Sequence, residues 1–542
     1  MNSAVANIKI IVMLISLSFF LSACSESAST MAPVNTSSMV STKTSTKTST
    51  KTPALTESSE IPALAYLEHD EIYNPESVIP PQCYTKTEGN KNPCFVCHQS
   101  YDDPLRPNYV KDMSLQGNYE FSDEGMKNSW KNLFIDRTEG IAAIDDHSIM
   151  QWVTEDNYSP FIENLKKDLS WKGELPAITN LAYPQKAFHE NGLAQDGSHW
   201  VAYNYKPLPS SFWPTNGSTG DAMIRLPKIF REINGQYSEV IYLKNLALLE
   251  QTIKDSRNKN SSVEEQKFYS GDADTIAIEH MLYPQGTEFL HTVRYLGIDA
   301  QGQVYNAPRM KEVRYMRKAK FNSAAALKSA YFIEAKEKTL GQLPQTTLIG
   351  DRGIDNGFGW VINGYIENQQ GELRQQNKQE LAYCNGCHKT LGSTIDQIFS
   401  FSRKVEGSSG WGYIDLEKIQ DVASKGSQVG EYLNYFERVG GGDEFRQNTE
   451  MKTRWFHHDG TVNKERIEKL KSIYPLITPS KERALKLNKA YKLIVEEQSY
   501  IFGRDAVLKP AKNVLQQVDS TTFPLLEEHR YAWDIRLDWS QP

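Results

Sequence analysis

The sequence predicts a mixed α+β protein that is rich in loops, with a central β-rich region and a mainly helical C-terminal part. Residues 80–214 contain many Pro, Asn, Gly and aromatic residues and only short helical patterns. Residues 222–321 carry strand-like patterns, whereas helical patterns dominate residues 463–498. The 542 residues exceed the length of one ordinary domain, so about two to four domains with apolar cores are expected.

In the loop-rich region, helical periodicity is confined to residues 123–134 and 159–169. The β-rich region contains three runs with strand character, which are residues 238–243, 288–297 and 303–307. The last two runs are separated by Asp299-Ala300-Gln301-Gly302, a composition typical of a turn. They are therefore predicted to pair as a hairpin.

Residues 322–340 are predicted to form a helix, because Asn322 or Ser323 can cap the Ala- and Leu-rich run that follows. A second hairpin is predicted from residues 360–367 through a turn at residues 368–371. Two further helices are predicted towards the C-terminus, over residues 463–473 and 480–498.

These patterns divide the chain into five segments. They are a signal peptide (residues 1–23), a disordered tether rich in Ser, Thr and Lys (24–60), a first region around a cysteine motif (61–215), a β-rich middle region (216–345) and a second, mostly helical region around a similar motif (346–542). The flanks of the two motifs do not match each other, so no internal duplication is indicated.

The N-terminus has the features of an export signal. Lys9 precedes an apolar stretch over residues 10–21, which is long enough for a signal peptide and too short to span a bilayer comfortably. The stretch ends in Leu21-Ser22-Ala23-Cys24, which resembles the lipobox of bacterial lipoproteins and implies that Cys24 is lipidated. By the same resemblance, Ser25 favours the outer membrane, facing the periplasm or the cell surface. The alternative is an ordinary signal peptide followed by an unrelated cysteine.

The charge of the chain excludes some classes of partner. The formal net charge is −7 at pH 7, and no basic stripe with interleaved aromatic residues stands out. Binding to nucleic acid depends on clustered Lys and Arg, so nucleic acid is not an expected partner. The few lysines of the tether are more typical of a solvated linker than of an anionic-surface patch. We therefore expect contact with a membrane through the lipid anchor.

Two pentapeptides that share one pattern give the strongest indication of function. Residues 94–98 read Cys-Phe-Val-Cys-His and residues 384–388 read Cys-Asn-Gly-Cys-His, and each is a C-x-x-C-H pattern typical of haem attachment. Two thiols three residues apart reach the two vinyl groups of one porphyrin, and the adjoining histidine is placed to bind the iron. The sequence therefore predicts a haem-binding body with two covalently bound haem c groups.

The two motifs are similar to those of the c-type cytochromes, and the resemblance covers ten residues. It implies covalent haem, an exported location and redox activity, but no fold. By this resemblance, the thioether-forming cysteines and the proximal iron ligands are Cys94, Cys97, His98, Cys384, Cys387 and His388. The sequence contains no Met-Pro, a dipeptide that often supplies the second iron ligand in small cytochromes of this family.

The cysteine pairs allow two other interpretations. A four-cysteine zinc site is one alternative, but its pairs normally lie about 12 to 20 residues apart and need no histidine after the second cysteine. A thioredoxin-like redox pair is another, but neither motif follows an evident strand in a βαβ pattern.

His291 is the main candidate for a second axial ligand. Alternation in the strand over residues 288–297 places His291 on an apolar face with Phe289, Val293 and Tyr295, so its side chain is expected to point inward. The alternative is a core histidine held by hydrogen bonds. The identity of this ligand matters, because an iron held on both sides transfers electrons whereas an open iron binds small ligands.

Cys83 remains after the lipobox and haem cysteines are assigned, and it lies eleven residues before Cys94. As a thiolate it is a second candidate for the sixth iron ligand and would lower the haem potential. The alternative is a small, buried apolar side chain.

The sequence thus favours a membrane-anchored dihaem c-type cytochrome that carries electrons between periplasmic or cell-surface partners, either redox proteins or a small-molecule electron acceptor. A dihaem redox enzyme of peroxidase or oxygenase type, with one open haem site, is the alternative, and the length of the chain around only two haems favours it. A surface-binding lipoprotein with a structural metal is a third, non-redox interpretation.

Overall fold

The computed structural model of the protein describes most of the chain beyond residue 80. The described residues are 81–86, 96, 126–211, 214–254, 266–340, 345–389, 394–441, 448–518, 522 and 534–540. All of them belong to one compact unit that extends from Ser59 to Pro542. Four residues of the predicted sites lie outside the described residues, together with the signal peptide and the tether; they are Cys24, Cys94, Cys97 and His98.

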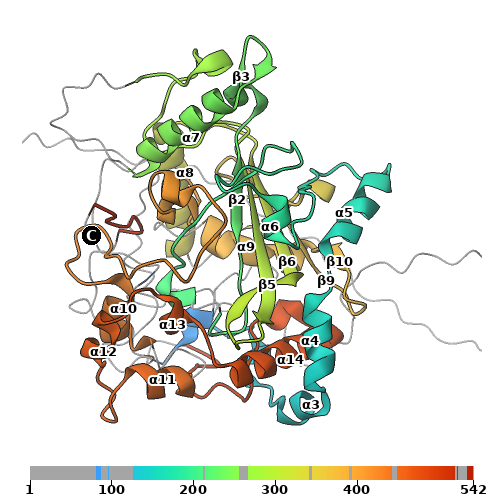
Figure 1. Ribbon diagram of the computed structural model, residues 1–542, viewed down its shortest axis with the longest axis vertical. Coiled ribbons are helices and arrows are strands. Elements are labelled where there is room, and N and C mark those ends of the chain that lie inside the picture. The colour runs from blue at the N-terminus through green and yellow to red at the C-terminus, as the bar shows by residue number, and fades with distance from the viewer. Residues whose placement is uncertain are drawn as a thin grey trace, which may run out of the picture. The chain divides into compact units, whose positions relative to one another are not determined.

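An eight-stranded antiparallel sheet forms the centre of this unit (Figure 1). Its strands follow the order β1-β2-β5-β6-β9-β8-β7, and β10 also pairs with β9. The strands of this sheet are β1 (Val201–Ala202), β2 (Ala222–Arg225), β5 (Glu288–Ile298), β6 (Val304–Lys318), β7 (Thr347–Leu348), β8 (Ile354–Asp355), β9 (Trp360–Glu367) and β10 (Leu373–Gln375). A separate hairpin pairs β3 (Glu232–Ile233) with β4 (Gln236–Tyr237).

Helices surround the sheet and dominate the C-terminal part, which confirms the predicted α+β fold class (Figure 1). Before the sheet is complete, the chain forms α3 (Thr138–Ala143), α4 (Asp146–Thr154), α5 (Tyr158–Lys167), α6 (Pro184–Ala187), α7 (Glu239–Lys254) and α8 (Ala324–Thr339). After β10 it forms α9 (Lys378–His388), α10 (Glu431–Val439), α11 (Thr449–Trp455), α12 (Lys464–Glu468), α13 (Tyr474–Ile477) and α14 (Lys481–Glu497).

The β5–β6 hairpin is the longest pairing of the sheet, and it confirms the predicted turn at residues 299–302. Gly302 adopts a positive φ of 84°, and the Asp299 carboxylate accepts the backbone N–H of Gln301 at 2.9 Å. Strand β6 extends to Lys318, well beyond the predicted end at residue 307. Several charged side chains interrupt the apolar alternation of β6, yet most of them are buried, so the sequence pattern concealed the strand.

Helices α3, α4 and α14 gather at one end of the long strands (Figure 1). Asn488 of α14 donates its side-chain amide to the carbonyl of Leu296 at 2.8 Å and accepts the N–H of Leu296 at 3.1 Å. This two-way bond satisfies a backbone position of β5 where a bulge interrupts its pairing with β6. The helix is thereby fixed against the sheet.

Two predicted elements are wrong and a third is too long. Residues 238–243 begin α7 rather than a strand, because buried Tyr242, Leu246, Leu249 and Ile253 follow a helical spacing that continues past the short β-like run. In residues 123–134, the described part contains only a 3-10 turn, Lys131–Phe134. The predicted helix over residues 463–473 is limited to α12, and α13 begins beyond it with a proline in its first turn.

The two faces of the sheet contact different layers. On one face, Phe289 of β5 and Met316 of β6 belong to the same apolar cluster as Leu381 of α9. On the other face, Leu290 and Val313 pack in a second cluster with residues of α5. Helix α9, with the second pentapeptide at its end, therefore belongs to the first face.

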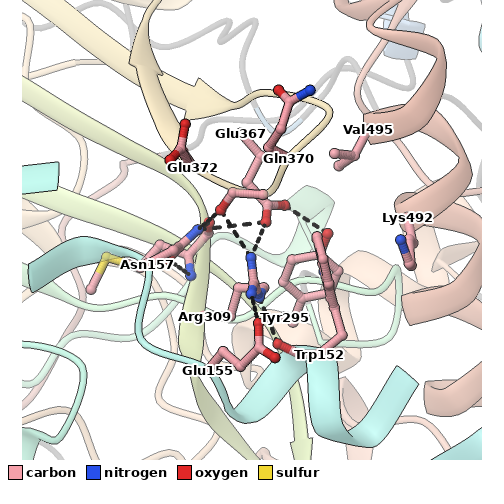
Figure 2. A network of polar contacts seen from close by, with 12 residues as sticks. Trp152, Glu155, Asn157, Tyr295, Arg309, Glu367, Gln370, Glu372, Lys492 and Val495 are labelled. Carbon is pink, nitrogen blue, oxygen red and sulfur yellow. Dashed lines mark hydrogen bonds and ion pairs between the residues drawn. The ribbon is translucent and has the colours of Figure 1, made fainter. Parts of the chain in front are cut away.

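A buried polar network joins β5, β6 and β9 (Figure 2). The Glu367 carboxylate accepts from Arg309 at 2.9 Å and from the Tyr295 hydroxyl at 2.7 Å, and its side chain is fully buried. Burial raises the pKa of Glu367 to about 7, although Arg309 and Tyr295 oppose the shift. The guanidinium of Arg309 also lies 3.8 Å from the centre of the Trp152 ring.

Removing the Glu367 carboxylate is expected to leave Arg309 with only the half-exposed Glu155 as an ion-pair partner and the Tyr295 hydroxyl without its acceptor. We predict that Glu367→Ala lowers the free energy of unfolding by about 2–3 kcal/mol, and that Glu367→Gln, which keeps an acceptor for Tyr295, lowers it less. Urea denaturation measures both. Glu372→Ala is the control, because Glu372 is exposed on the same hairpin, and it is expected to change stability by about 0.5 kcal/mol or less. A loss in Glu367→Ala no larger than that of the control would contradict the prediction.

Candidate functional site

The second pentapeptide forms the last turn of α9, and the first turn of this helix is firmly held. Asn377 accepts the N–H of Glu380 at 3.0 Å, and the Glu380 carboxylate accepts the N–H of Asn377 at 3.0 Å. Arg374 then binds both oxygens of Glu380 at 2.8 Å. The position of α9 is thus fixed from its N-terminal end.

Helical spacing places Cys384, Cys387 and His388 on one face of α9, because they are three and four residues apart. All three are partly buried. Burial raises the pKa of the Cys387 thiol to about 11 and also raises that of Cys384. Thiols with raised pKa values are weak nucleophiles, which disfavours a thioredoxin-like redox pair at these positions.

The imidazole of His388 is oriented by a backbone carbonyl. Its Nδ1 lies 2.7 Å from the carbonyl oxygen of Gln397, which can only accept, so Nδ1 carries the proton. The lone pair of Nε2 is then available to a metal, an arrangement that is usual for iron- and zinc-binding histidines. Asn356 donates to the carbonyl of His388 at 2.9 Å and holds the end of the helix.

The loop that supplies the Gln397 carbonyl is strained and held by a buried ion pair. Asp396 and Gln397 have φ values of 46° and 68°, which residues other than glycine rarely adopt. The Asp396 carboxylate pairs with Lys318 of β6, both side chains being fully buried, and accepts the N–H of Tyr283 at 3.0 Å. Strand β6 therefore fixes the position of the Gln397 carbonyl that accepts the hydrogen bond from His388.

His291 and Arg314 are direct cross-strand partners on β5 and β6, on the face of the sheet that α9 covers. His291 is the one position of β5 that is not fully buried, and the Arg314 side chain is 40% exposed. Small residues flank the pair in the same row, Ala222 on β2 and Gly364 on β9. The row thus places two polar side chains between two small residues, and the Gln376 side chain fills the position above Gly364.

Electrostatic shifts place this pair close to α9. Burial lowers the pKa of His291 to about 3, and the charges of Arg314 and His388 lower it further. Burial also lowers the pKa of His388, again with a contribution from Arg314. The Tyr205 hydroxyl lies 3.3 Å from Nε2 of His291. The inward orientation expected for His291 is therefore observed, together with a hydrogen-bond partner.

Cys83 lies in the 3-10 turn Pro81–Tyr84 and is partly buried. It is one of the groups whose charge raises the pKa of Cys387, so the two thiols are close in space. No disulfide links the described cysteines Cys83, Cys384 and Cys387.

The remaining described histidines lie elsewhere. The exposed ones are His147, His189, His457 and His458, and the partly buried ones are His199 and His280. The sequence did not point to Arg314 or Gln397 as site residues. The charged Arg314 in a strand was a signal, whereas the Gln397 carbonyl carries none in the sequence.

The site residues suit one of two kinds of metal group. Within the part of the chain that the structure describes, no three His, Cys, Asp or Glu side chains gather as a metal held by side chains alone would require. A covalently attached haem instead needs two thiols and one imidazole on the same face of a helix, with the ring nitrogen that does not bind the iron held by a hydrogen bond. Cys384, Cys387 and His388 fit this requirement.

We predict that the Lys318–Asp396 pair is required as a unit. Asp396→Ala is expected to cost about 3–5 kcal/mol of unfolding free energy, because it leaves the Lys318 ammonium buried alone. The double variant Lys318→Met/Asp396→Ala is expected to recover most of this loss, measured by urea denaturation. Asp415→Ala, which breaks a surface pair with a largely exposed lysine, serves as the control and is expected to have little effect. Additive losses in the double variant would refute the pairing.

Comparisons with known proteins identify a family of lipoproteins. A family model described as ":-like lipoprotein" matches residues 67–474. An "Uncharacterized lipoprotein" of Aquifex aeolicus (strain VF5) is 32% identical over 520 residues, covering 83% of this chain and 89% of its own. No solved structure matches. Within the described residues, no helix has both the length and the apolar character needed to cross a bilayer.

These findings correct one conclusion from the sequence. The resemblance to c-type cytochromes does not identify the family, because both the matching family model and the relative are described as lipoproteins and neither is described as a cytochrome. The resemblance rested on ten residues, and a motif of that size occurs on unrelated folds. Matches that extend over most of the chain outweigh it, and the chain belongs to this family of membrane-anchored lipoproteins.

Proposed function

We propose that this lipoprotein is a redox protein that holds two covalently bound haem groups and passes electrons between periplasmic or cell-surface partners. The partners would be other redox proteins or a small-molecule electron acceptor. One observation carries the proposal: the hydrogen bond from His388 to Gln397 presents the other ring nitrogen on the helical face that carries Cys384 and Cys387.

When bound, haem supplies a one-electron couple between ferric and ferrous iron. The chain would contribute the two thiols that fix the porphyrin, the His388 imidazole that holds the iron, and the apolar surroundings that restrict water. Positive charge from Arg314 nearby would favour the reduced iron. By the sequence pattern alone, Cys94, Cys97 and His98 would hold the second group in the same way.

The membrane anchor is part of the proposal. Lipidation at Cys24 would attach the protein to the outer membrane, and the segment from residue 24 to residue 60 would act as a tether. Electron transfer would then take place within reach of the membrane surface. The position of Ser25 after Cys24 supports the outer membrane over the inner one.

The direct test is to remove one attachment site. We expect Cys384→Ser/Cys387→Ser to lose half of the pyridine haemochrome absorbance of the purified protein, because one of two porphyrins can no longer form thioethers. Cys83→Ser, which alters a nearby thiol outside either pentapeptide, is the control and is expected to retain full absorbance. Wild-type protein without haemochrome absorbance would refute the proposal.

A second candidate function is a redox enzyme in which one iron keeps an open position. The Tyr205–His291 contact favours it, because Nε2 of His291 is already engaged at 3.3 Å. An unligated His291 beside Arg314 would combine a neutral imidazole that can hydrogen-bond a ligand with a fixed positive charge. Such a pair suits the activation of a small oxygen-containing ligand rather than simple electron transfer.

The spin state of the oxidised iron distinguishes the two functions. If His291 is the second axial ligand, His291→Ala is expected to convert one haem from low spin to high spin in the electron paramagnetic resonance spectrum. His458→Ala, an exposed histidine, should leave the spectrum unchanged. If one haem is already high spin in the wild type and His291→Ala does not change it, electron transfer through a His291-ligated iron is excluded and the enzyme is favoured.

A further inference from the structure

Arg314 is an unusual residue for the centre of a sheet. It lies on β6 between His291 of β5 and Gly364 of β9, in strands that are otherwise almost entirely buried. Its Nε donates to the Glu312 carboxylate at 2.9 Å. Among the residues that the structure describes, no acceptor lies within hydrogen-bond distance of its two terminal Nη groups, and the side chain is 40% exposed.

A second guanidinium lies beside the same carboxylate. Arg504 donates from Nη1 to Glu312 at 3.2 Å and from Nη2 to the backbone carbonyl of Glu380. Its side chain is only 10% exposed, and its Nε has no acceptor in the described part of the chain. A buried donor without an acceptor is costly in a folded protein, so a water molecule or a bound group is expected beside this Nε.

The charges at this place do not balance. Glu312 is shared by Arg314 and Arg504, whereas the nearby Glu380 carboxylate is already bound through both oxygens by Arg374. Among the residues that the structure describes, two guanidinium groups therefore share one carboxylate, which leaves one positive charge in excess. Arg504 contacts α9 directly, because it donates to the Glu380 carbonyl and its guanidinium lies 5.1 Å from the centre of the Tyr383 ring. The excess charge consequently lies next to the helix that carries the second pentapeptide.

We propose that Arg314, assisted by Arg504, binds a carboxylate, and that this carboxylate is a propionate of the haem attached to Cys384 and Cys387. The inference rests on the proposed function and adds the residues that orient the porphyrin. A planar guanidinium with two unoccupied Nη groups matches the two oxygens of a carboxylate, which an ammonium cannot do. A porphyrin fixed by two thioethers can still tilt, and a bidentate bond to one propionate would restrain it.

The test compares two arginines on one strand. Arg314→Gln removes the positive charge, so the reduction potential of one haem is expected to fall, because the electron that enters the iron is no longer stabilised by that charge. Arg314→Lys retains charge but not bidentate geometry, so a smaller fall is expected. Arg317→Gln is the control, since Arg317 is 41% exposed on the opposite face of β6, and its haem potentials should equal those of the wild type. Spectroelectrochemistry of the purified holoprotein measures all four.

Three results would overturn the assignment in different ways. Haem present on the Cys384 peptide together with unchanged potentials in Arg314→Lys and Arg314→Gln would refute the role of Arg314 alone. If Arg314→Gln does not fold, an unchanged potential in Arg314→Lys decides against the proposal. A saturable spectral shift when acetate is added to the wild type would mean that the site takes a free carboxylate instead of a propionate. Absence of haem from that peptide would instead refute the proposed function itself.

Discussion

The register of β5, β6 and β9 is the constraint on which the candidate site depends. It aligns Ala222, His291, Arg314 and Gly364 in one row across the sheet, so that two polar side chains lie between two small residues. A shift of one residue would move His291 and Arg314 to the opposite face, against α5 instead of α9. The site therefore exists only if this pairing is exact to the residue.

Buried ion pairs specify that register. Strand β6 carries Arg309, Glu312 and Lys318, and each pairs with a residue of a different segment, namely Glu367, Arg504 and Asp396. Buried pairs are weak sources of net stability, because desolvation costs about as much as the attraction returns. Their use here is geometric, since any other register would leave several charges unpaired. The Lys318–Asp396 pair also fixes the loop that orients His388 relative to β6.

Local patterns predicted much of the fold. The β5–β6 turn, the strand β9 and the helices α5, α8 and α14 were all predicted, because each has a turn, cap or period that a short window contains. Strand β6 was predicted too short, since its buried charges are stable only through partners distant in sequence. The start of α7 was predicted as a strand because six residues of a helix can mimic alternation.

The candidate site was predicted only in part. The pentapeptide and the inward-facing His291 could be identified from the sequence, since a motif and a period mark them. The proximity of Arg314 to α9 depends on strand pairing, and the role of Gln397 depends on a backbone carbonyl, for which no residue type is diagnostic. The family was misjudged for the opposite reason, because two strong motifs of five residues each say nothing about the chain around them.

The most direct test of the account is the mass of the proteolytic peptide that contains Cys384 and Cys387, taken from protein extracted from its native membrane. The account predicts a peptide whose mass is increased by one haem, attached through both cysteines. An unmodified peptide with two free thiols, from cells that attach haem to other proteins, would contradict it.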